Sequence, residues 1–405
     1  MKIAFLMNHF DTTNIPKNPR HIGYYITKHL KRHGAEVEII PPAVPKATEF
    51  YYKIKQAYYK YFLKKRHLRY SEIRLIQEEA KIRSEILKKS NADFTFSFGP
   101  IASAFLETDK KIAYWTDSTV AGLLGYHPDF LNLTKSTIKN TDYLERLCIA
   151  RSSVVFLTSN WAKDIAIKAY SNITEDSSFN FFTKNNNQKI SDKMVIAPFG
   201  ANIDNDHSEE QIVNFIQRRL LSDEIKILFI SYSWLVKGGD IAVEIVKRIN
   251  EKGHRAKLII IGCNPELPPE LMKYVEIIGS IDKINNFEKM NSFLENSFFY
   301  LSPARAENFG HALVEANSFG VPSISTITGG VTDVIKNGIN GQLFDLNASI
   351  DEFADYIINT FEDKEKYRQL CLSSFNEYKT RLNWNYGTKI VYDTLKNILE
   401  SSLKS

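Results

Sequence analysis

The chain has 405 residues, of which 43% are hydrophobic and 24% are charged. This is the composition of an ordinary globular protein, and the length predicts two to three domains, each large enough to bury a core. The net charge of +5 is a mild basic excess. It is compatible with contact to phosphates or anionic lipid, and it gives no reason to expect nucleic acid as a partner.

The cysteines and the first residues exclude several classes of protein. Cys148, Cys263 and Cys371 lie far apart, so they offer neither a zinc-ligand spacing nor a disulfide framework. We expect each to be a small buried apolar residue in a reducing compartment. The apolar run at residues 2–7 is too short for a signal peptide, and no run approaches the roughly 18 apolar residues of a membrane span. The expected location is the cytoplasm.

In the C-terminal half, strand-like and helix-like segments alternate. Apolar runs begin at Lys226, Ala256, Phe298 and Pro322, and helical patterns cover 240–253, 287–297 and 311–320. Apolar strands that alternate with helices predict a parallel sheet covered on both faces. Gly253 and Gly320 stand where a glycine commonly ends a helix.

The N-terminal half repeats this pattern. Strand candidates begin at Lys2, Ala35, Asp93, Lys111, Val154 and Met194, with helical patterns at 20–34 and 160–170. The polar stretch 171–192 is typical of a surface excursion, and a domain boundary is expected at 201–210. The predicted class is therefore α/β, with two doubly wound, Rossmann-like domains. If they face each other, the cleft between them is the natural ligand site.

The segment 301–344 carries the densest set of candidate binding residues. A strand ends at Pro303, a loop then carries Arg305 and Glu307, and Gly310 opens a helix. The backbone amides of Gly310 and His311 at that helix start, with the positive end of the helix dipole, form an anion site suited to a diphosphate.

Two acids flank this helix start. Glu307 lies on the loop and Glu315 about one and a half turns into the helix, so both can face one ligand. A carboxylate accepts hydrogen bonds from two hydroxyls at once, as the vicinal diols of a sugar and a ribose require. For an arbitrary pair of glutamates, a helix-start acid and a surface acid would be the commoner interpretation.

The order of residues in this segment strongly resembles glycosyltransferase family 4. The resemblance rests on Glu307 and Glu315 with seven residues between them, on the run Glu307-Asn308-Phe309-Gly310, and on EANSFGVPSIST continuing into Gly329-Gly330 and NGINGQLF. It implies the GT-B fold, a nucleotide-diphosphate sugar as donor, and retention of the donor's anomeric configuration. It also implies a catalytic role for Glu307 and donor contacts from Phe309, Gly329 and Gly330.

A second match to this family is SWLVKGGDIAVEI, which begins at Ser233. A lysine that precedes a glycine pair and a helix can cancel charge developing on a leaving diphosphate, although a solvated loop lysine is commoner. In the family a lysine here contacts the phosphates, which implies that role for Lys237, with Ser233 beside the donor. Many members have an arginine five residues earlier, where this chain has Tyr232. Arg305 or another basic residue is the alternative phosphate partner.

The N-terminal half resembles the family as well. YWTDSTVAGLLGYHPDFLNL, from Tyr114, is similar to a branch with a Trp-Thr-Asp run after a central strand. Other members place a histidine that touches the donor sugar near this point, which makes Asp117 a catalytic candidate. A helix N-cap is an equally open interpretation of Asp117.

The family's domain pattern also maps onto the chain. VIAPFGANID, from Val195, resembles the end of the first domain, and LNWNYGTKIVYDTLKNIL, from Leu382, resembles a terminal helix that crosses back to it. The expected domains are 1–203 together with 384–405, on the acceptor side, and 204–383, on the donor side.

No metal or resident cofactor is expected. Asp204-Asn205-Asp206 fits the DxD form of metal-dependent glycosyltransferases, but it falls in the expected interdomain turn, where Asp and Asn are common. The chain has neither a Walker loop nor a GxGxxG fingerprint, which argues against an NTPase and a simple dehydrogenase. The nucleotide-diphosphate sugar would be a co-substrate.

The segment 51–75 is rich in tyrosine, lysine and arginine, and its pattern predicts one long helix. Three interpretations stay open: a solvated helix over the core, an acceptor-binding face, and a contact with an anionic membrane surface. Nucleic acid is not expected, because no RNA-binding signature accompanies the basic residues.

These observations predict a retaining, hexosyltransferase-type glycosyltransferase. It would move a sugar from a nucleotide-diphosphate donor to a glycan or lipid-linked acceptor, in the setting of bacterial surface polysaccharide synthesis. Two alternatives remain open, namely a GT-B epimerase that acts on a sugar nucleotide, and a non-catalytic nucleotide-sugar binder or assembly partner.

Overall fold

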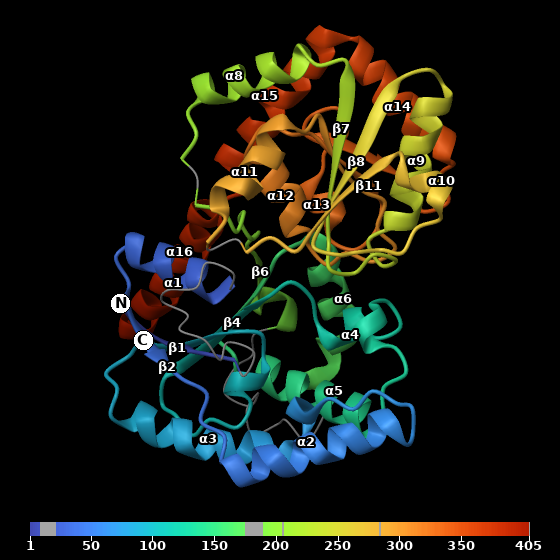
Figure 1. Cartoon of the computed structure of the whole chain (residues 1–405). Coiled ribbons are helices and arrows are strands. Elements are labelled where there is room, and N and C mark those ends of the chain that lie inside the picture. Colours follow the sequence, from blue (N-terminus) through green and yellow to red (C-terminus); the bar gives the residue numbers. More distant parts are fainter. Residues whose placement is uncertain (9–21, 175–188, 205, 283–284, 405) are drawn as a thin grey trace. The chain divides into compact units, whose positions relative to one another are not determined.

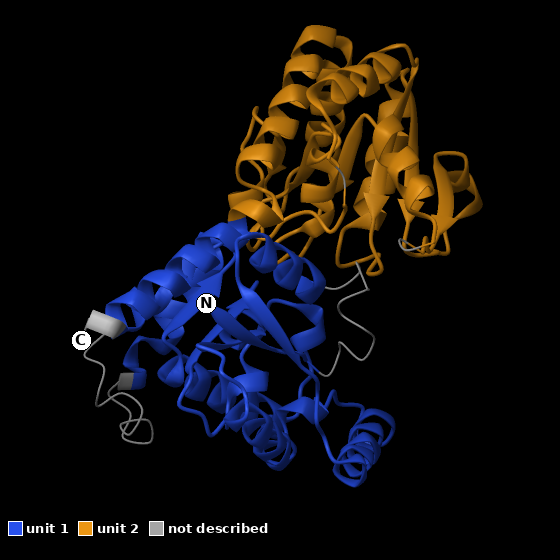
Figure 2. Ribbon diagram, turned by 90° about the vertical axis from the view of Figure 1, so that its left-hand side faces the viewer, with its two compact units in different colours: residues 1–198, 387–405 blue, residues 199–386 orange. Residues whose placement is uncertain are grey.

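The computed structural model describes residues 1–8, 22–174, 189–204, 206–282 and 285–404. The chain divides into two compact units (Figure 2). Unit 1 comprises Met1–Pro198 and Gly387–Ser405, and unit 2 comprises Phe199–Tyr386. The expected excursion at 171–192 lies largely outside the described residues, as do the first two residues of the helix expected at 20–34.

Unit 1 is built on a six-stranded parallel sheet with the order β2-β1-β3-β4-β5-β6. Its strands are β1 (Lys2–Leu6), β2 (Glu36–Ile40), β3 (Phe94–Phe98), β4 (Lys111–Thr116), β5 (Val154–Leu157) and β6 (Met194–Ile196). The central strands β1, β3, β4 and β5 are almost wholly buried, as a sheet covered on both faces requires.

Helices connect these strands and cover the sheet (Figure 1). They are α1 (Ile22–Arg32), α2 (Lys46–Tyr61), α3 (Ile73–Lys88), α4 (Val120–Leu123), α5 (Lys135–Arg151) and α6 (Asn160–Tyr170). Side-chain caps set several of their starts, because a hydroxyl satisfies an amide that has no partner within the helix. Thr134 caps α5, with its Oγ1 3.2 Å from the amide of Thr137, and Ser159 caps α6.

Unit 2 has a second six-stranded parallel sheet, with the order β12-β11-β10-β7-β8-β9. Its strands are β7 (Glu224–Ile230), β8 (Arg255–Ile261), β9 (Val275–Gly279), β10 (Phe299–Ser302), β11 (Ser323–Thr326) and β12 (Gly341–Phe344). The predicted class, α/β with two doubly wound sheets, is thereby confirmed. Gly253 and Gly320 follow their helices with φ angles of 92° and 62°, the left-handed conformation expected of them.

The helices of unit 2 are α8 (Glu209–Leu220), α9 (Gly239–Glu251), α10 (Pro269–Met272), α11 (Phe287–Asn296), α12 (His311–Asn317), α13 (Val331–Val334), α14 (Ile350–Glu362) and α15 (Lys364–Thr380). Capping boxes begin α8 at Ser208 and α14 at Ser349. The terminal helix α16 (Trp384–Lys404) begins in unit 2 and belongs to unit 1 from Gly387 onward.

One predicted element is wrong. The long helix expected over 51–75 is two helices, because α2 ends at Tyr61 and α3 begins at Ile73. Lys64 has a φ of 53°, which a helix does not tolerate, and Arg66 forms an isolated bridge with Leu133. Tertiary pairing with the segment before α5 therefore ends the helix despite good local helix formers.

Among the described residues, no helix is both long enough and apolar enough to cross a membrane. The three cysteines are free thiols, and Cys148 and Cys371 are buried as expected, whereas Cys263 is only half-buried. Burial raises the pKa of the Cys148 thiol to about 12 and that of Cys371 to about 11, so both stay protonated at neutral pH.

Candidate active site

The sheet of unit 2 has a switch point between β7 and β10. From the central strand β7 the chain runs to β8 and β9 on one side, and then returns to β10, β11 and β12 on the other. The connections on the two sides of such a point diverge and leave a crevice at the carboxyl ends of the strands, where open α/β sheets bind ligands. The residues that follow β7 and β10 are therefore the first candidates for a site.

Lys237 and Glu307 meet at this point. Lys237 lies in the loop after β7 and Glu307 in the loop after β10, and their Nζ and Oε2 atoms are 2.9 Å apart. The Lys237 ammonium also donates a hydrogen bond of 2.8 Å to the carbonyl of Ala306. Each side chain keeps about a fifth of its surface exposed, 19% and 20%, so this charge pair faces solvent that a ligand can displace.

A close backbone approach brings these two loops together. Gly238 has a φ of 72°, and a Cβ atom at this position would lie 1.9 Å from the carbonyl oxygen of Pro303. Only glycine allows that approach. The loop after β7 also holds Ser233, which is exposed and whose carbonyl accepts a hydrogen bond of 3.1 Å from the amide of Lys237.

Arg305 ties the same two loops together on its side of the crevice. Its guanidinium donates two hydrogen bonds of 2.8 Å to the carboxylate of Asp240 and a third to the carbonyl of Leu235. This pairing lowers the pKa of the Asp240 carboxyl, chiefly through the hydrogen bonds from Arg305. The structure thus gives Arg305 a partner in the protein, and its visible role is to position the Lys237 loop.

The loop that carries Glu307 is fixed at both ends. The amide of Gly330, in the Gly329-Gly330 turn after β11, donates to the Glu307 carbonyl at 3.3 Å. Gly310 begins α12 with a φ of 95°, a conformation that side chains rarely adopt. The predicted residues Glu307, Gly310, Gly329 and Gly330 therefore belong to one loop cluster at the carboxyl edge of the sheet.

Glu315 lies behind this cluster on α12, with only 2% of its surface exposed. The hydroxyl of Tyr300, on β10, interacts electrostatically with both Glu307 and Glu315. Burial raises the pKa of Tyr300, and the carboxylates of Glu307 and Glu315 raise it further. The same Tyr300 hydroxyl donates a hydrogen bond of 3.2 Å to the carbonyl of Ile230, at the end of β7.

Phe309 and His311 belong to an aromatic cluster. The His311 ring stacks on Phe199 at a centroid distance of 5.4 Å, and its Nδ1 is 3.2 Å from the carbonyl oxygen of Gly200. Phe309 is 1% exposed and packs edge-on against Phe199, which also contacts Trp384. These rings anchor the start of α12, so His311 and Phe309 would reach a ligand through their backbone.

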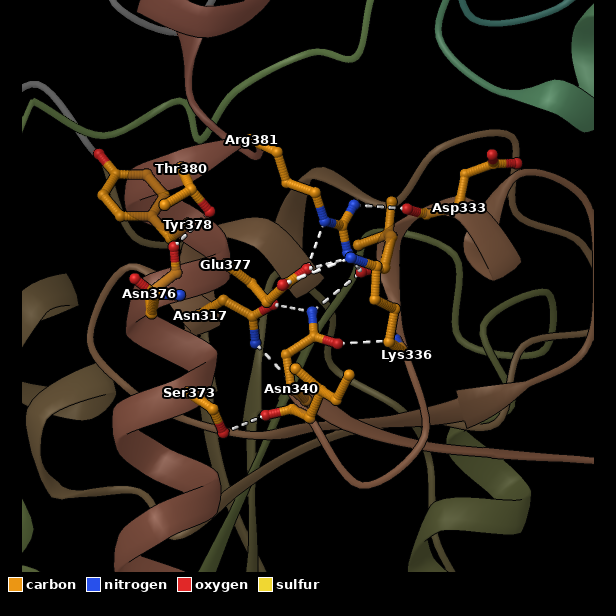
Figure 3. A network of polar contacts seen from close by, with 12 residues as sticks. Asn317, Asp333, Lys336, Asn340, Ser373, Asn376, Glu377, Tyr378, Thr380 and Arg381 are labelled. Carbon is orange, nitrogen blue, oxygen red and sulfur yellow. Dashed lines mark hydrogen bonds and ion pairs between the residues drawn. The ribbon is translucent and has the colours of Figure 1, made fainter.

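A buried polar network anchors the other end of α12 (Figure 3). The side-chain amides of Asn317 and Asn340 are joined by a hydrogen bond of 2.8 Å, and both residues are fully buried. Asn340 Oδ1 accepts from the amide of Lys336, and the Lys336 ammonium in turn pairs with Glu377 on α15. The helix that carries Glu315 is thereby held at both ends, as a preorganised site requires.

In unit 1, Asp117 follows β4 and is half-buried. The N-cap of the short helix α4 is Thr119, whose side chain accepts from the amide of Gly122, so Asp117 is not that cap. The Asp117 carbonyl accepts a hydrogen bond from Thr158. Residues 9–21, which follow Asn8, lie outside the described residues, as does Asn205 of the DxD run.

A buried acid that the sequence did not reveal supports the Asp117 loop. Glu145, on α5, accepts hydrogen bonds through Oε2 from the Val120 amide and, at 2.8 Å, from the Tyr170 hydroxyl. Its Oε1 has no hydrogen-bond partner in the described part of the chain. Burial raises the pKa of the Glu145 carboxyl to about 7, an effect that the two donors only partly offset.

This pKa predicts how the stability of unit 1 changes with pH. Between the ordinary value near 4.5 and about 7, the folded state holds the Glu145 proton and the unfolded state has lost it, so stability falls as pH rises. The full effect is on the order of 3 kcal/mol. Glu145→Gln keeps an acceptor for Val120 and should remove this loss.

Urea unfolding at pH 5 and pH 8 measures the effect. We expect the stability of Glu145→Gln relative to wild type to grow by several tenths to a few kcal/mol between these pH values. A difference that stays constant with pH would show that Glu145 does not titrate in this range.

Comparison with known proteins adds a family signature to this geometry. Residues 211–371 match the family model described as glycosyl transferases group 1. This match contains the loops after β7, β10 and β11, and with them the Lys237–Glu307 pair and Glu315. It covers less than half of the chain, all of it within unit 2.

Curated relatives align with part of the chain. N-acetyl-alpha-D-glucosaminyl L-malate synthase of Bacillus anthracis is 26% identical over 182 residues, which cover 44% of this chain and 47% of that protein. The capsular polysaccharide biosynthesis glycosyltransferase CapM of Staphylococcus aureus is 23% identical over 224 residues, or 52% and 56% of the two chains. The chain thus spans about half the length of the curated relatives that it matches.

A solved structure matches nearly the whole chain. Anabaena Alr3699/HepE in complex with UDP and glucose superposes with a TM-score of 0.59, covers 98% of this chain and 99% of its own, and is 15% identical. At that identity the likeness concerns the fold, which is GT-B. Residues 211–371 therefore carry the sequence signature of the glycosyl transferases group 1, within a chain that has the GT-B fold.

Proposed function

We propose that this protein is a glycosyltransferase that moves a sugar from a nucleotide-diphosphate donor held by unit 2. The observation that carries the proposal is the Lys237–Glu307 pair at the switch point of the unit 2 sheet, with Glu315 behind it. A fixed ammonium beside two carboxylates suits a ligand that combines phosphates with sugar hydroxyls. The group 1 family match over this unit and the UDP and glucose bound to the Anabaena protein support the same ligand class.

In the proposed complex each residue has one role. The diphosphate lies at the backbone amides of Gly310 and His311, with Lys237 beside it to offset its charge. Glu315 accepts hydrogen bonds from the ribose hydroxyls, and Glu307 accepts them from the donor sugar and orients its reacting carbon. The Gly329-Gly330 turn and Ser233 line the donor. No metal takes part in this scheme.

We further propose that the reaction retains the configuration of the donor, as in glycosyltransferase family 4. The bond from the sugar carbon to the phosphate oxygen breaks while the acceptor oxygen attacks the same face. The departing phosphate oxygen takes the acceptor proton, so no protein nucleophile is needed. Lys237 stabilises the charge that develops on the leaving diphosphate, and most of the rate comes from positioning and charge stabilisation.

The acceptor in this proposal is a glycan or a lipid-linked sugar bound by unit 1, near Asp117. The relative CapM supports a setting in polysaccharide biosynthesis, because its name assigns it to that process. Thr119, and not Asp117, caps α4, and the Glu145 contact to Val120 holds the loop that carries Asp117. These features make unit 1 the place to search for acceptor specificity.

A thermal-shift screen against UDP, GDP, ADP, CDP and dTDP sugars tests the proposal. A ligand that binds only the native state raises its stability with the logarithm of ligand concentration over Kd, so the donor should raise the melting temperature and its analogues should not. Product analysis of the best donor, with and without glycan acceptors, then identifies the reaction. A new sugar nucleotide formed without acceptor would indicate an epimerase, and binding without any turnover would indicate a non-catalytic binder.

A further inference from the structure

The helix α2 has two different apolar sides. At about 100° per residue, Tyr52 and Tyr59 lie on one side of the helix, and Phe50, Ile54, Tyr58 and Tyr61 lie on the opposite side. Tyr52 is buried in the core of unit 1, and Tyr59 stacks on the ring of His67. The inner side is thus an ordinary core-facing stripe. The outer side needs a separate explanation.

Polar contacts hold the inner side in place. Lys55 pairs with Glu72 at 2.6 Å, and Thr48 donates a hydrogen bond to Glu78 on α3. Gln56 accepts a hydrogen bond of 3.4 Å from Arg69. Because α2 is fixed to α3 and to the segment between them, the orientation of its outer side is set by the fold (Figure 1).

The outer side exposes an unusual amount of apolar surface. We define the α2 face as Phe50, Tyr51, Ile54, Tyr58, Tyr61, Phe62 and Leu63, which are between 48% and 77% exposed. Scattered apolar residues on a surface are normal, but seven that share one short segment form a patch. Two of these rings contact each other, since Tyr58 stacks on Phe62 at a centroid distance of 5.4 Å.

Basic residues border this face. Lys46, Lys53 and Lys60 are spaced by seven residues, which places them in one row along its edge, and all three are exposed. Lys64 and Lys65 follow the end of the helix, and both are exposed as well. Between residues 46 and 66 the chain has seven basic residues and one acidic residue, Glu49.

We infer that the α2 face docks on the surface of an anionic lipid bilayer. An apolar stripe rich in tyrosine and phenylalanine and flanked by lysines is the pattern of helices that lie in a membrane interface, with rings at the headgroup level and ammonium groups on the lipid phosphates. The excess of positive charge complements an anionic leaflet. An acidic protein partner would match the lysines but not the seven exposed apolar side chains.

This docking brings the chain to the lipid surface through an interfacial helix. It goes beyond the proposed glycosyltransferase function, because a bilayer can be bound whether or not sugar is transferred. It also gives unit 1, the proposed acceptor side, direct access to an acceptor that is carried by a lipid.

Vesicle flotation of the full chain tests the inference. The probes are phosphatidylcholine vesicles with and without phosphatidylglycerol, at about 0.15 M salt. Wild-type protein should float with the anionic vesicles and remain at the bottom with neutral ones. Wild-type protein that fails to float with anionic vesicles would overturn the inference.

Two variants separate charge from apolar contact. In the first variant, Lys46, Lys53, Lys60 and Lys64 become Gln. Each lysine lost should lower the partition coefficient onto anionic vesicles about fivefold, so the recovery of protein with the vesicles should fall at least tenfold. In the second, Phe50, Ile54 and Phe62 become Ser, and recovery should fall to a similar extent. All of these side chains are exposed, so the melting temperature should stay that of wild type.

Matched controls make the same changes elsewhere on the surface. Lys168, Lys273, Lys289 and Lys366 are exposed lysines for the charge control, and Leu221, Met272 and Leu346 are exposed apolar residues for the second control. Both controls should float like wild type. Equal losses in controls and test variants would mean that net charge or overall hydrophobicity, and not the α2 face, drives binding. If wild-type protein is a dimer that does not bind vesicles, and the apolar variant is a monomer, the face would be assigned to a second copy of the chain.

Discussion

Lys237→Ala is expected to reduce sugar transfer by about 10²- to 10³-fold, the largest effect of any single change considered. The wild-type ammonium lies 2.9 Å from Glu307 at the end of the two strands that flank the switch point. If the leaving group is a diphosphate, removal of the Lys237 ammonium leaves the charge that develops on it without its nearest compensating group. The loss should appear in kcat, because the charge is greatest in the transition state.

The measurement is release of the nucleoside diphosphate from the donor found by thermal shift, with circular dichroism and the melting temperature as checks on the fold. Lys247→Ala is the matched control, since Lys247 is a lysine on α9 whose partner, Glu244, lies on the surface with it. That control should keep the wild-type rate. A wild-type rate in Lys237→Ala would remove Lys237 from the site.

A double variant shows whether Lys237 and Glu307 act as a pair. In Lys237→Ala, Glu307 loses its ion-pair partner, so part of the defect could come from a displaced carboxylate and not from the missing charge at the phosphate. If Lys237→Ala/Glu307→Ala is no worse than the poorer single variant, the two residues act as one unit. Losses that multiply would indicate separate roles.

Most strands of the unit 2 sheet could be predicted from the sequence, because its central strands are short apolar runs. The runs that begin at Lys226 and Ala256 became β7 and β8, whose inner residues are buried. The two strands that were not predicted, β9 and β12, lie at the edges of the unit 2 sheet and are partly exposed. An edge strand is covered less, so its sequence need not be uniformly apolar, and the signal that finds a central strand is weak there.

In the candidate site, the positions of single residues could be predicted from the sequence, but contacts between distant residues could not. Local sequence placed Lys237 and Glu307 in loops that follow strands, and the resemblance to a known family suggested that both serve the donor. The pairing of Arg305 with Asp240 could not be predicted, because it depends on a contact between residues 65 positions apart. The structure shows Arg305 bound to Leu235 and Asp240, and its contact with the donor stays a prediction.

Unit 1 was less accessible to sequence reasoning. The role of Glu145 depends on burial and on the arrival of Val120 and Tyr170 from other elements, and no local pattern indicates such an encounter. The break between α2 and α3 has a similar origin, since Arg66 pairs with Leu133. In both cases tertiary contacts overrode what the local sequence favoured.

Glu315→Gln is expected to weaken donor binding by about 10²-fold while the protein stays folded. Glu315 is 2% exposed on a helix anchored at both ends, so the substitution of an isosteric amide leaves no cavity, whereas alanine would add a packing defect to the lost charge. A carboxylate that accepts hydrogen bonds from both ribose hydroxyls cannot be replaced by an amide, because the amide nitrogen only donates. One such bond is lost, and a donor group of the ribose is left without its acceptor.

The expected signature separates Glu315 from Lys237. Since the ribose does not change during the reaction, the contact is the same in the ground state and the transition state, and its loss should raise the KM for the donor more than it lowers kcat. The thermal shift given by the donor should shrink in parallel, and Glu244→Gln, on the surface of α9, should leave both quantities unchanged. An unchanged KM with a reduced kcat would place Glu315 at the reacting sugar, and no change in either would remove it from the site.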